Sequence, residues 1–218
     1  MKVIIFGATG MIGQGVLAEC LKDEGIAEVL AVLRSPTGRQ HAKLRELIHR
    51  DFFDYSLIEA DLAGYDACFF CLGVTSVGMK EEDYRRLTYD LTVAAASTLA
   101  RLNPQMTFVF VSGKSADSTE KGSVMWARVK GAAENAVLAL PFKGYVFRPS
   151  IIQPTPGITS KTGLYRAVYA TMGVLLPLIK RLAPDMVITS EQFGRAMIRV
   201  ARQGASKRVL EPADINAL

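Results

Sequence analysis

The chain has 218 residues, half of them hydrophobic, which excludes a disordered protein and allows one domain with a sizeable core. Its 26 basic and 21 acidic side chains give a net charge of +5 that is spread along the sequence, which argues against a nucleic-acid surface and suits a phosphorylated ligand. The three cysteines fit a reducing compartment, and a strand pattern at the very start leaves no room for a signal peptide, so we expect a cytoplasmic protein.

The first 21 residues carry the motif on which the functional prediction depends. Val3–Phe6 form an apolar run typical of a strand buried on both faces, and Gly7, Gly10 and Gly13 follow before a helical pattern. We expect Gly7 to allow a tight turn, Gly10 to let a phosphate approach bare backbone, and Gly13 to let the helix pack on the strand. Such a helix start binds anions, so the stretch predicts a cradle for the diphosphate of a dinucleotide; a turn that only packs is the alternative.

The next two strands are expected to supply the adenine end of the same site. Glu28–Leu33 is followed by Arg34, about 20 residues past the glycine turn, where a site that prefers NAD would place an acid. A guanidinium there could clamp a 2′-phosphate, so we predict NADP(H), with NAD(H) as the alternative. After the third strand, Leu44–His49, we expect Asp51 and Phe52 beside the adenine.

The fourth strand, Asp66–Leu72, ends at a turn that we expect to line the ligand. Cys68 and Cys71 project to opposite faces of a strand, which makes a redox pair improbable. The useful feature is the turn Cys71-Leu72-Gly73, because open α/β sheets bind ligands at the carboxyl ends of their strands. Neither histidine belongs to a cluster with metal-ligand spacing, so no metal site is predicted.

The middle of the chain continues the alternation of strands and helices. A long helix over Glu81–Leu102 leads to a strand over Met106–Val111, then a helix over about Ser123–Leu140 and a strand over Tyr145–Arg148 that Pro149 closes. This order predicts an α/β fold with a doubly wound parallel sheet of the Rossmann type. An exposed helix face could also support a homodimer.

The last third of the single domain 1–218 is expected to form a small helical lobe on the substrate side, over residues 150–206. Its apolar stretch Ala167–Ile179 has 13 residues, short of the roughly 20 that span a bilayer. We interpret it as a helix that could cover a small hydrophobic ligand, with contact to a membrane surface as the alternative. Thr189–Gln203 reads as an amphipathic helix capped by Thr189 or Ser190.

Together these motifs resemble the short-chain dehydrogenase/reductase superfamily, in particular its atypical, epimerase-like branch with the Tat-interacting-protein-like oxidoreductases and the NmrA-like regulators. The resemblance covers nearly the whole chain and is carried by Gly7-Ala8-Thr9-Gly10-Met11-Ile12-Gly13, Asp51-Phe52, Cys71-Leu72-Gly73, Val111-Ser112, Val129-Lys130-Gly131 with Glu134, and Phe147-Arg148-Pro149-Ser150. It implies a cofactor site formed by Gly7, Thr9, Gly10, Met11, Ile12, Gly13, Arg34, Asp51, Phe52, Cys71, Leu72, Gly73, Lys130, Pro149 and Ser150.

The resemblance also implies a catalytic group of a serine and a Tyr-x-x-x-Lys pair. Ser112 and Lys130 match the serine and the lysine, and Trp126 occupies the tyrosine position. An indole cannot act as an acid or base near neutrality. Two readings follow: an oxidoreductase or epimerase with another proton donor, or a sensor that binds NADP(H) without turnover and uses Trp126 as a wall. The candidate donors are Tyr84, Tyr89, Tyr165 and Tyr169.

Overall fold

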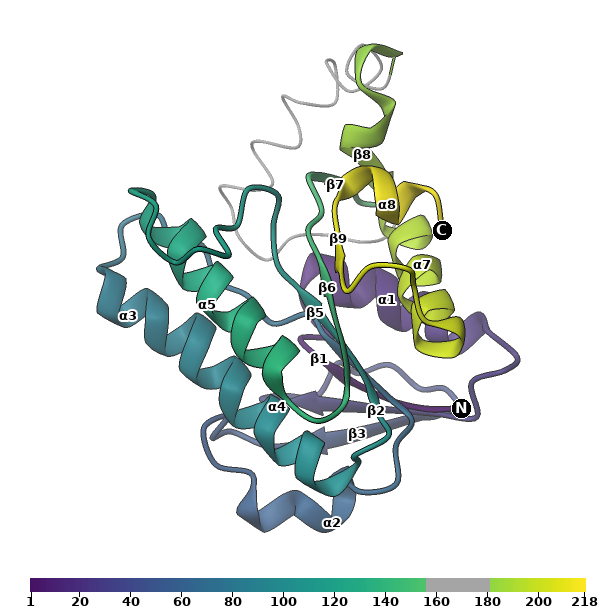
Figure 1. Cartoon of the computed structure of the whole chain (residues 1–218). Helices are drawn as coiled ribbons and strands as arrows, with labels where there is room; N and C mark the ends of the chain where they lie inside the picture. Colours follow the sequence, from purple (N-terminus) through teal and green to yellow (C-terminus); the bar gives the residue numbers. More distant parts are fainter. Residues whose placement is uncertain (156–180) are drawn as a thin grey trace.

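A computed structural model describes residues 1–155 and 181–218 and contains the predicted doubly wound sheet (Figure 1). Its strand order is β3-β2-β1-β4-β5-β6-β9, and every neighbouring pair is parallel. The strands are β1 (Lys2–Phe6), β2 (Glu28–Leu33), β3 (Leu44–Ile48), β4 (Ala67–Phe70), β5 (Thr107–Val111), β6 (Lys143–Phe147) and β9 (Val209–Leu210). The order reverses between β1 and β4, which is where such sheets bind ligands.

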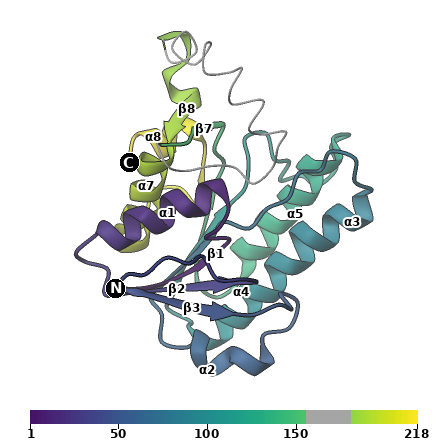
Figure 2. The ribbon, with the colours of Figure 1, turned by 180° about the vertical axis from the view of Figure 1, so that it is seen from behind.

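Helices cover both faces of the sheet, as the views from the two sides show (Figures 1 and 2). On one face, α1 (Met11–Lys22) packs against α7 (Ser190–Gln203). On the other, α5 (Met125–Ala139) lies beside a long helix made of α3 (Glu81–Arg85), the π-helical turn η2 (Arg86–Asp90) and α4 (Leu91–Leu102).

Short elements complete the described part of the chain. They are the turn η1 (Ser56–Ile58), α2 (Glu59–Leu62), a separate parallel pair of β7 (Ile151–Gln153) and β8 (Val187–Thr189), the turn η3 (Pro184–Met186) and α8 (Pro212–Asn216).

Alternate residues of each strand enter two separate cores, because the side chains of a strand point to opposite faces. Val3 and Ile5 pack with residues of α1 and α7, whereas Ile4 and Phe6 pack with residues of α4 and α5. All four are fully buried. The apolar run at the start of the chain therefore contributes side chains to both cores, one under each layer of helices.

Element boundaries differ from the predictions by a few residues. The sixth strand begins at Lys143 and ends at Phe147 rather than spanning Tyr145–Arg148, because its pairing with β5 starts at Thr107 and Lys143. The cap of α7 is confirmed at Thr189, whose hydroxyl accepts the Gln192 N–H at 3.1 Å.

Several predictions for the last third concern residues outside the described part. They are the apolar helix Ala167–Ile179 and the candidate donors Tyr165 and Tyr169. The role of residues 150–206 as a substrate-side lobe therefore stays a prediction, although α7 itself belongs to the layer of α1. Among residues 1–155 and 181–218, no helix has both the length and the apolar character needed to cross a bilayer.

Candidate functional site

The turn between β1 and α1 has a backbone that glycine alone accommodates at two positions. Gly7 has φ of +79°, and a methyl group on it would lie 2.8 Å from the backbone of Cys71. On Gly13 a methyl group would lie 2.1 Å from the carbonyl oxygen of Gly7. Two hydrogen bonds close the turn. The Gly10 N–H donates to the Gly7 carbonyl at 2.9 Å, and the side-chain amide of Gln14 donates through Nε2 to the Thr9 carbonyl at 3.0 Å.

The start of α1 presents backbone N–H groups that the helix itself cannot use. Gly10 is the N-cap, no side chain caps the helix, and its first turn holds no acidic residue. Among the described residues, the N–H groups of Met11, Ile12 and Gly13 are therefore available at the positive end of the helix dipole. A methyl group on exposed Gly10 would meet the Gly7 carbonyl oxygen at 3.3 Å and no other atom of those residues within 4 Å. This open, positively polarised cradle fits the diphosphate of a dinucleotide.

The adenine end is assembled in part as predicted. Arg34 directly follows β2, is exposed, and has no hydrogen bond or ion pair with any residue in the described ranges, so its guanidinium is available to a phosphate. Asp51 is exposed and its carboxylate accepts the Phe53 N–H at 2.9 Å. The Phe52 ring, however, is buried against Phe6 in an edge-on contact, so only the backbone of Phe52 can face a ligand.

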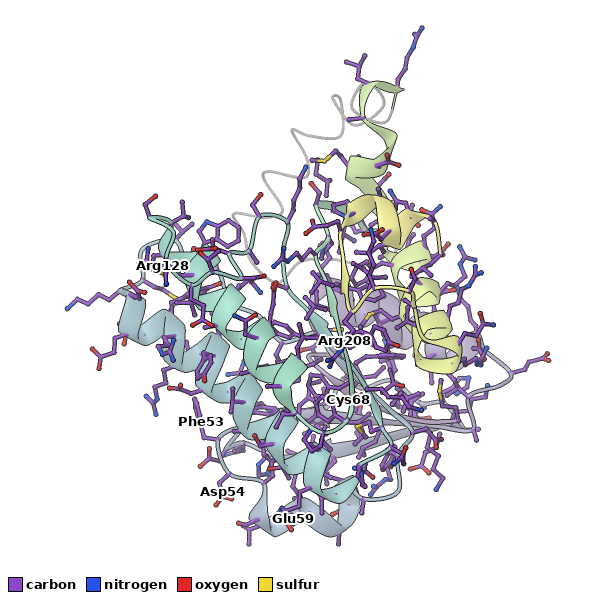
Figure 3. The ribbon with its side chains drawn as sticks, in the orientation of Figure 1. Phe53, Asp54, Glu59, Cys68, Arg128 and Arg208 are labelled. Carbon is purple, nitrogen blue, oxygen red and sulfur yellow. The ribbon has the colours of Figure 1, made fainter. Side chains whose placement is uncertain are left out.

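The turn after β4 runs directly beside the cradle. The Cys71 N–H donates to the Phe6 carbonyl at 3.0 Å, which holds this turn against the end of β1. A methyl group placed on Gly73 would have no atom of residues 1–155 or 181–218 within 4 Å. Cys68 lies in the interior (Figure 3), in the core under α4 and α5, whereas Cys71 packs on the opposite core, as predicted from their spacing. No disulfide joins them.

Ser112, Trp126 and Lys130 lie where β5 meets α5. The Trp126 ring lies over the backbone that follows Ser112, because its Cζ3 atom would be 3.9 Å from a methyl group on Gly113. Lys130 is half-buried, with its Nζ atom 5.5 Å from the centroid of the Phe110 ring. Burial lowers the pKa of Lys130 to about 8, against a smaller opposite effect of the Glu134 charge.

A buried ion pair holds Ser112, and reasoning from the sequence missed it. The Ser112 hydroxyl donates to Glu134, which is fully buried, and Arg148 donates to the same carboxylate through Nε at 3.0 Å and through Nη2. Arg148 also donates to Glu211 at 2.9 Å and to Ser118 at 2.6 Å. The sequence carried one signal for this network: an acid on a face of α5 that is otherwise glycine, alanine and valine.

The end of β6 contributes backbone to the same edge. The Pro149 carbonyl accepts the Lys114 N–H at 2.9 Å, which ties the segment after β6 to the loop after β5. Pro149 is buried, and Ser150 is half-buried. Of the described tyrosine candidates, Tyr84 is 2% exposed, and Tyr89 lies under the Arg85 guanidinium at 4.0 Å.

Two other kinds of ligand site receive no support from the described residues. Within the described ranges, no three His, Cys, Asp or Glu side chains are placed to hold a metal ion. A depression of about 410 Å³ lies at the opposite edge of the sheet, near Asp66, Asn103 and Lys143. It opens at the amino ends of the strands, whereas the cradle and Ser112 lie at the carboxyl ends, so we assign it no ligand.

Comparison with known proteins agrees with this geometry. The protein family described as NAD(P)H-binding matches the chain over residues 7–142. The protein fmp52-2, mitochondrial, of Aspergillus terreus is 24% identical over 202 residues, which cover 91% of this chain and 85% of the relative. The protein FMP52, mitochondrial, of Chaetomium globosum is 26% identical over 230 residues, which cover 97% and 94%.

Solved structures share the fold at low sequence identity. The Bordetella bronchiseptica enzyme WbmF in complex with NAD+ has a TM-score of 0.70 at 15% identity, covering 99% of this chain and 76% of that one. The UDP-glucuronic acid 4-epimerase of Bacillus cereus in complex with NAD has a TM-score of 0.67 at 13% identity, covering 97% and 76%. These neighbours establish a Rossmann-type architecture.

Proposed function

The chain belongs to the NAD(P)H-binding family, and on that premise we propose that it is an NADP(H)-dependent oxidoreductase or epimerase-type enzyme acting on a small, hydrophobic ligand. Gly10, with the open N–H groups of the first turn of α1, would hold the diphosphate, and Arg34 would hold the 2′-phosphate. A bound nicotinamide would supply or accept a hydride at the edge where Ser112 and Lys130 meet.

One observation carries this proposal: the half-buried Lys130 amine lies on the same sheet edge as the open cradle. β5, which leads to Ser112, is separated from β1 by β4 alone. A cradle that served only to pack α1 on β1 would not need a titratable amine at the same end of the sheet. The lowered pKa of Lys130 is typical of groups at functional sites.

The test has two parts: oxidation of NADPH with a panel of aldehydes, ketones and quinones, and product analysis of UDP-sugars incubated with the oxidised coenzyme, because an epimerase consumes no net coenzyme. The UDP-sugars are chosen because of the Bacillus cereus neighbour. We expect turnover that falls on Lys130→Ala and is unchanged on Lys121→Ala, an exposed lysine in the loop before α5. A panel without turnover by the wild type contradicts an enzymatic role.

Trp126 supports a second candidate function, a sensor that binds NADP(H) without turnover. It is the single tryptophan, and it stands where the resembling enzymes have their acid and base. The sensor predicts that NADPH quenches the Trp126 fluorescence while no substrate is consumed. Reductase activity in the wild type removes its basis.

A cytoplasmic location is part of the proposal and is open to a direct check. The two fungal relatives carry mitochondrial names. Fractionation of the tagged protein decides, and recovery with mitochondria would replace the cytoplasmic assignment.

A further inference from the structure

Reduction of a carbonyl needs a proton source, and the residue at the expected position cannot be one. Trp126 carries an indole N–H, which donates a hydrogen bond but does not exchange its proton near neutrality. Its ring lies along the backbone at Gly113. Trp126 therefore shapes the edge without supplying a proton.

Ser112 and Glu134 are also committed elsewhere. The single hydroxyl proton of Ser112 is donated to Glu134, so Ser112 offers a ligand only its oxygen lone pairs. Glu134 is fully buried and engaged by two donors of Arg148 as well. Neither group can deliver a proton without breaking this ion pair, and breaking a buried pair costs about 3–5 kcal/mol.

Lys130 differs from both in its surroundings. It follows Trp126 by one helical turn and so lies on the same face of α5. Its Nζ atom lies over the Phe110 ring, and among the described residues no carboxylate lies within ion-pair distance of that atom. This half-buried amine is thus a titratable group close to Ser112 that no carboxylate among the described residues engages.

Charged and titratable groups on the elements packed against α5 are held elsewhere or exposed. Glu81, the first residue of α3, pairs with Arg128 in the first turn of α5 at 2.7 Å (Figure 3). The others are Tyr84, which is buried, exposed Glu82, Asp83, Asp90 and Lys143, Arg85 over the Tyr89 ring, Arg86 over the Phe53 ring, Arg101 paired with Glu59, and half-buried Tyr145, whose hydroxyl accepts the Ala205 N–H. Glu134 acts on Lys130 through its charge alone.

We propose that the Lys130 ammonium is the acid that protonates the oxygen of a carbonyl substrate, and that the neutral amine is the base in the reverse direction. The inference rests on the proposed oxidoreductase function. When bound, the coenzyme would supply the hydride that the carbonyl carbon accepts. One N–H bond of Lys130 breaks as the O–H bond of the alcohol forms, and the amine regains its proton from water. A pKa of about 8 keeps both forms of Lys130 populated near neutrality, as a general acid and base requires.

The experiment uses two readouts on the full chain, with Lys130→Arg as the main variant, because arginine keeps the charge and does not titrate in this range. Competitive acetylation followed by mass spectrometry measures the pKa of Lys130 without any substrate, with exposed Lys121 as the reference amine. Single-turnover reduction of the aldehyde, ketone or quinone that the wild type turns over measures the proton step. It is followed by NADPH absorbance from about pH 6 to 10, and Trp126 fluorescence measures NADPH binding.

We expect Lys130 to titrate near pH 8, below the value of about 10.4 for a free lysine. The wild-type reduction rate should fall about tenfold per pH unit above that point. Lys130→Arg should bind NADPH within about threefold of the wild type but lose roughly 10²- to 10⁴-fold in rate, the usual cost of removing a positioned acid. The remaining slow rate should no longer depend on pH in this range.

Three results would overturn the inference. Lys130 could titrate as a free lysine does, Lys130→Arg could keep the wild-type rate, or Tyr165→Phe or Tyr169→Phe could abolish the alkaline fall that Lys130→Arg leaves in place. Failure of the proposed function looks different. A chain that binds NADPH but reduces nothing removes the enzymatic role whatever the acetylation shows, and a normal titration of Lys130 removes its acid role whatever the turnover.

Discussion

Replacing Gly10 with alanine separates ligand binding from folding at the cradle, because the structure has room there for a methyl group. The nearest atom would be the Gly7 carbonyl oxygen at 3.3 Å, and the Gly10 angles, φ −76° and ψ 164°, suit any residue. Alanine is a poor N-cap, so we expect a loss of about 1 kcal/mol in unfolding free energy, or roughly 2–4 °C in melting temperature. The methyl group would occupy the space that a phosphate needs. Losing one charge-assisted hydrogen bond costs about 2 kcal/mol, which is roughly thirtyfold in Kd for NADPH.

Gly13→Ala is the matched control, because the same methyl group has no room there. It would lie 2.1 Å from the Gly7 carbonyl oxygen and 2.7 Å from the Gly7 carbonyl carbon, both backbone atoms, so α1 must move away from β1. Overpacking costs about 1–3 kcal/mol, of which better helix propensity returns at most about 1. Thermal unfolding without ligand and calorimetry with NADPH measure the two effects. If Gly10→Ala binds NADPH within threefold of the wild type, the diphosphate does not lie at this helix start.

Four other substitutions test separate parts of the structure. Arg34→Asp should weaken NADPH binding at least tenfold and NADH binding much less, and equal losses in calorimetry would mean that Arg34 does not contact the 2′-phosphate. Glu134→Gln, which leaves Arg148 with one carboxylate partner instead of two, should lower the unfolding free energy by about 3 kcal/mol in urea titration; a loss under 1 would show that the pair is replaceable. Thr189→Ala should lower the melting temperature by roughly 2–4 °C through loss of the α7 cap, with Ser in its place restoring it. Burial lowers the pKa of Lys130 to about 8 in the folded chain, so the unfolded chain binds that proton more tightly and stability should rise with pH between about 8 and 10.5; Lys130→Met should flatten the rise in melting temperature measured across this interval.

The sequence predicts best those strands that are buried on both faces, because their residues form a continuous, mostly apolar run. Glu28–Leu33 and Val3–Phe6 are apolar runs because both faces of a central parallel strand are covered. β9 was missed because Val209–Leu210 has two residues, too few to show a period, and exists through its pairing with Val146 and Phe147. The pair β7 and β8 was missed for the same reason, with three residues in each strand.

Backbone features of the site were also readable, because they depend on local geometry. The positive φ of Gly7 and the close approach of Gly13 to Gly7 follow from one strand, one turn and one helix. The Phe52 ring shows the limit of that reasoning. The sequence places Phe52 next to the adenine end, but the ring packs in the core against Tyr55, three residues on, and against Phe6, which comes from a distant part of the chain.

The hydrogen bonding around Ser112 could not be predicted in the same way, because it depends on contacts between elements that are distant in the sequence. Ser112 follows β5, Glu134 lies on α5, and Arg148 follows β6, so the direction of the Ser112 hydroxyl depends on all three packing together. A free serine at this position could donate to a carbonyl oxygen, whereas a serine that already donates to Glu134 can only accept. The same side chain therefore changes its chemical role through a partner 22 residues away. Because neither Ser112 nor Trp126 can then donate a proton to a carbonyl oxygen, we assign that role to Lys130.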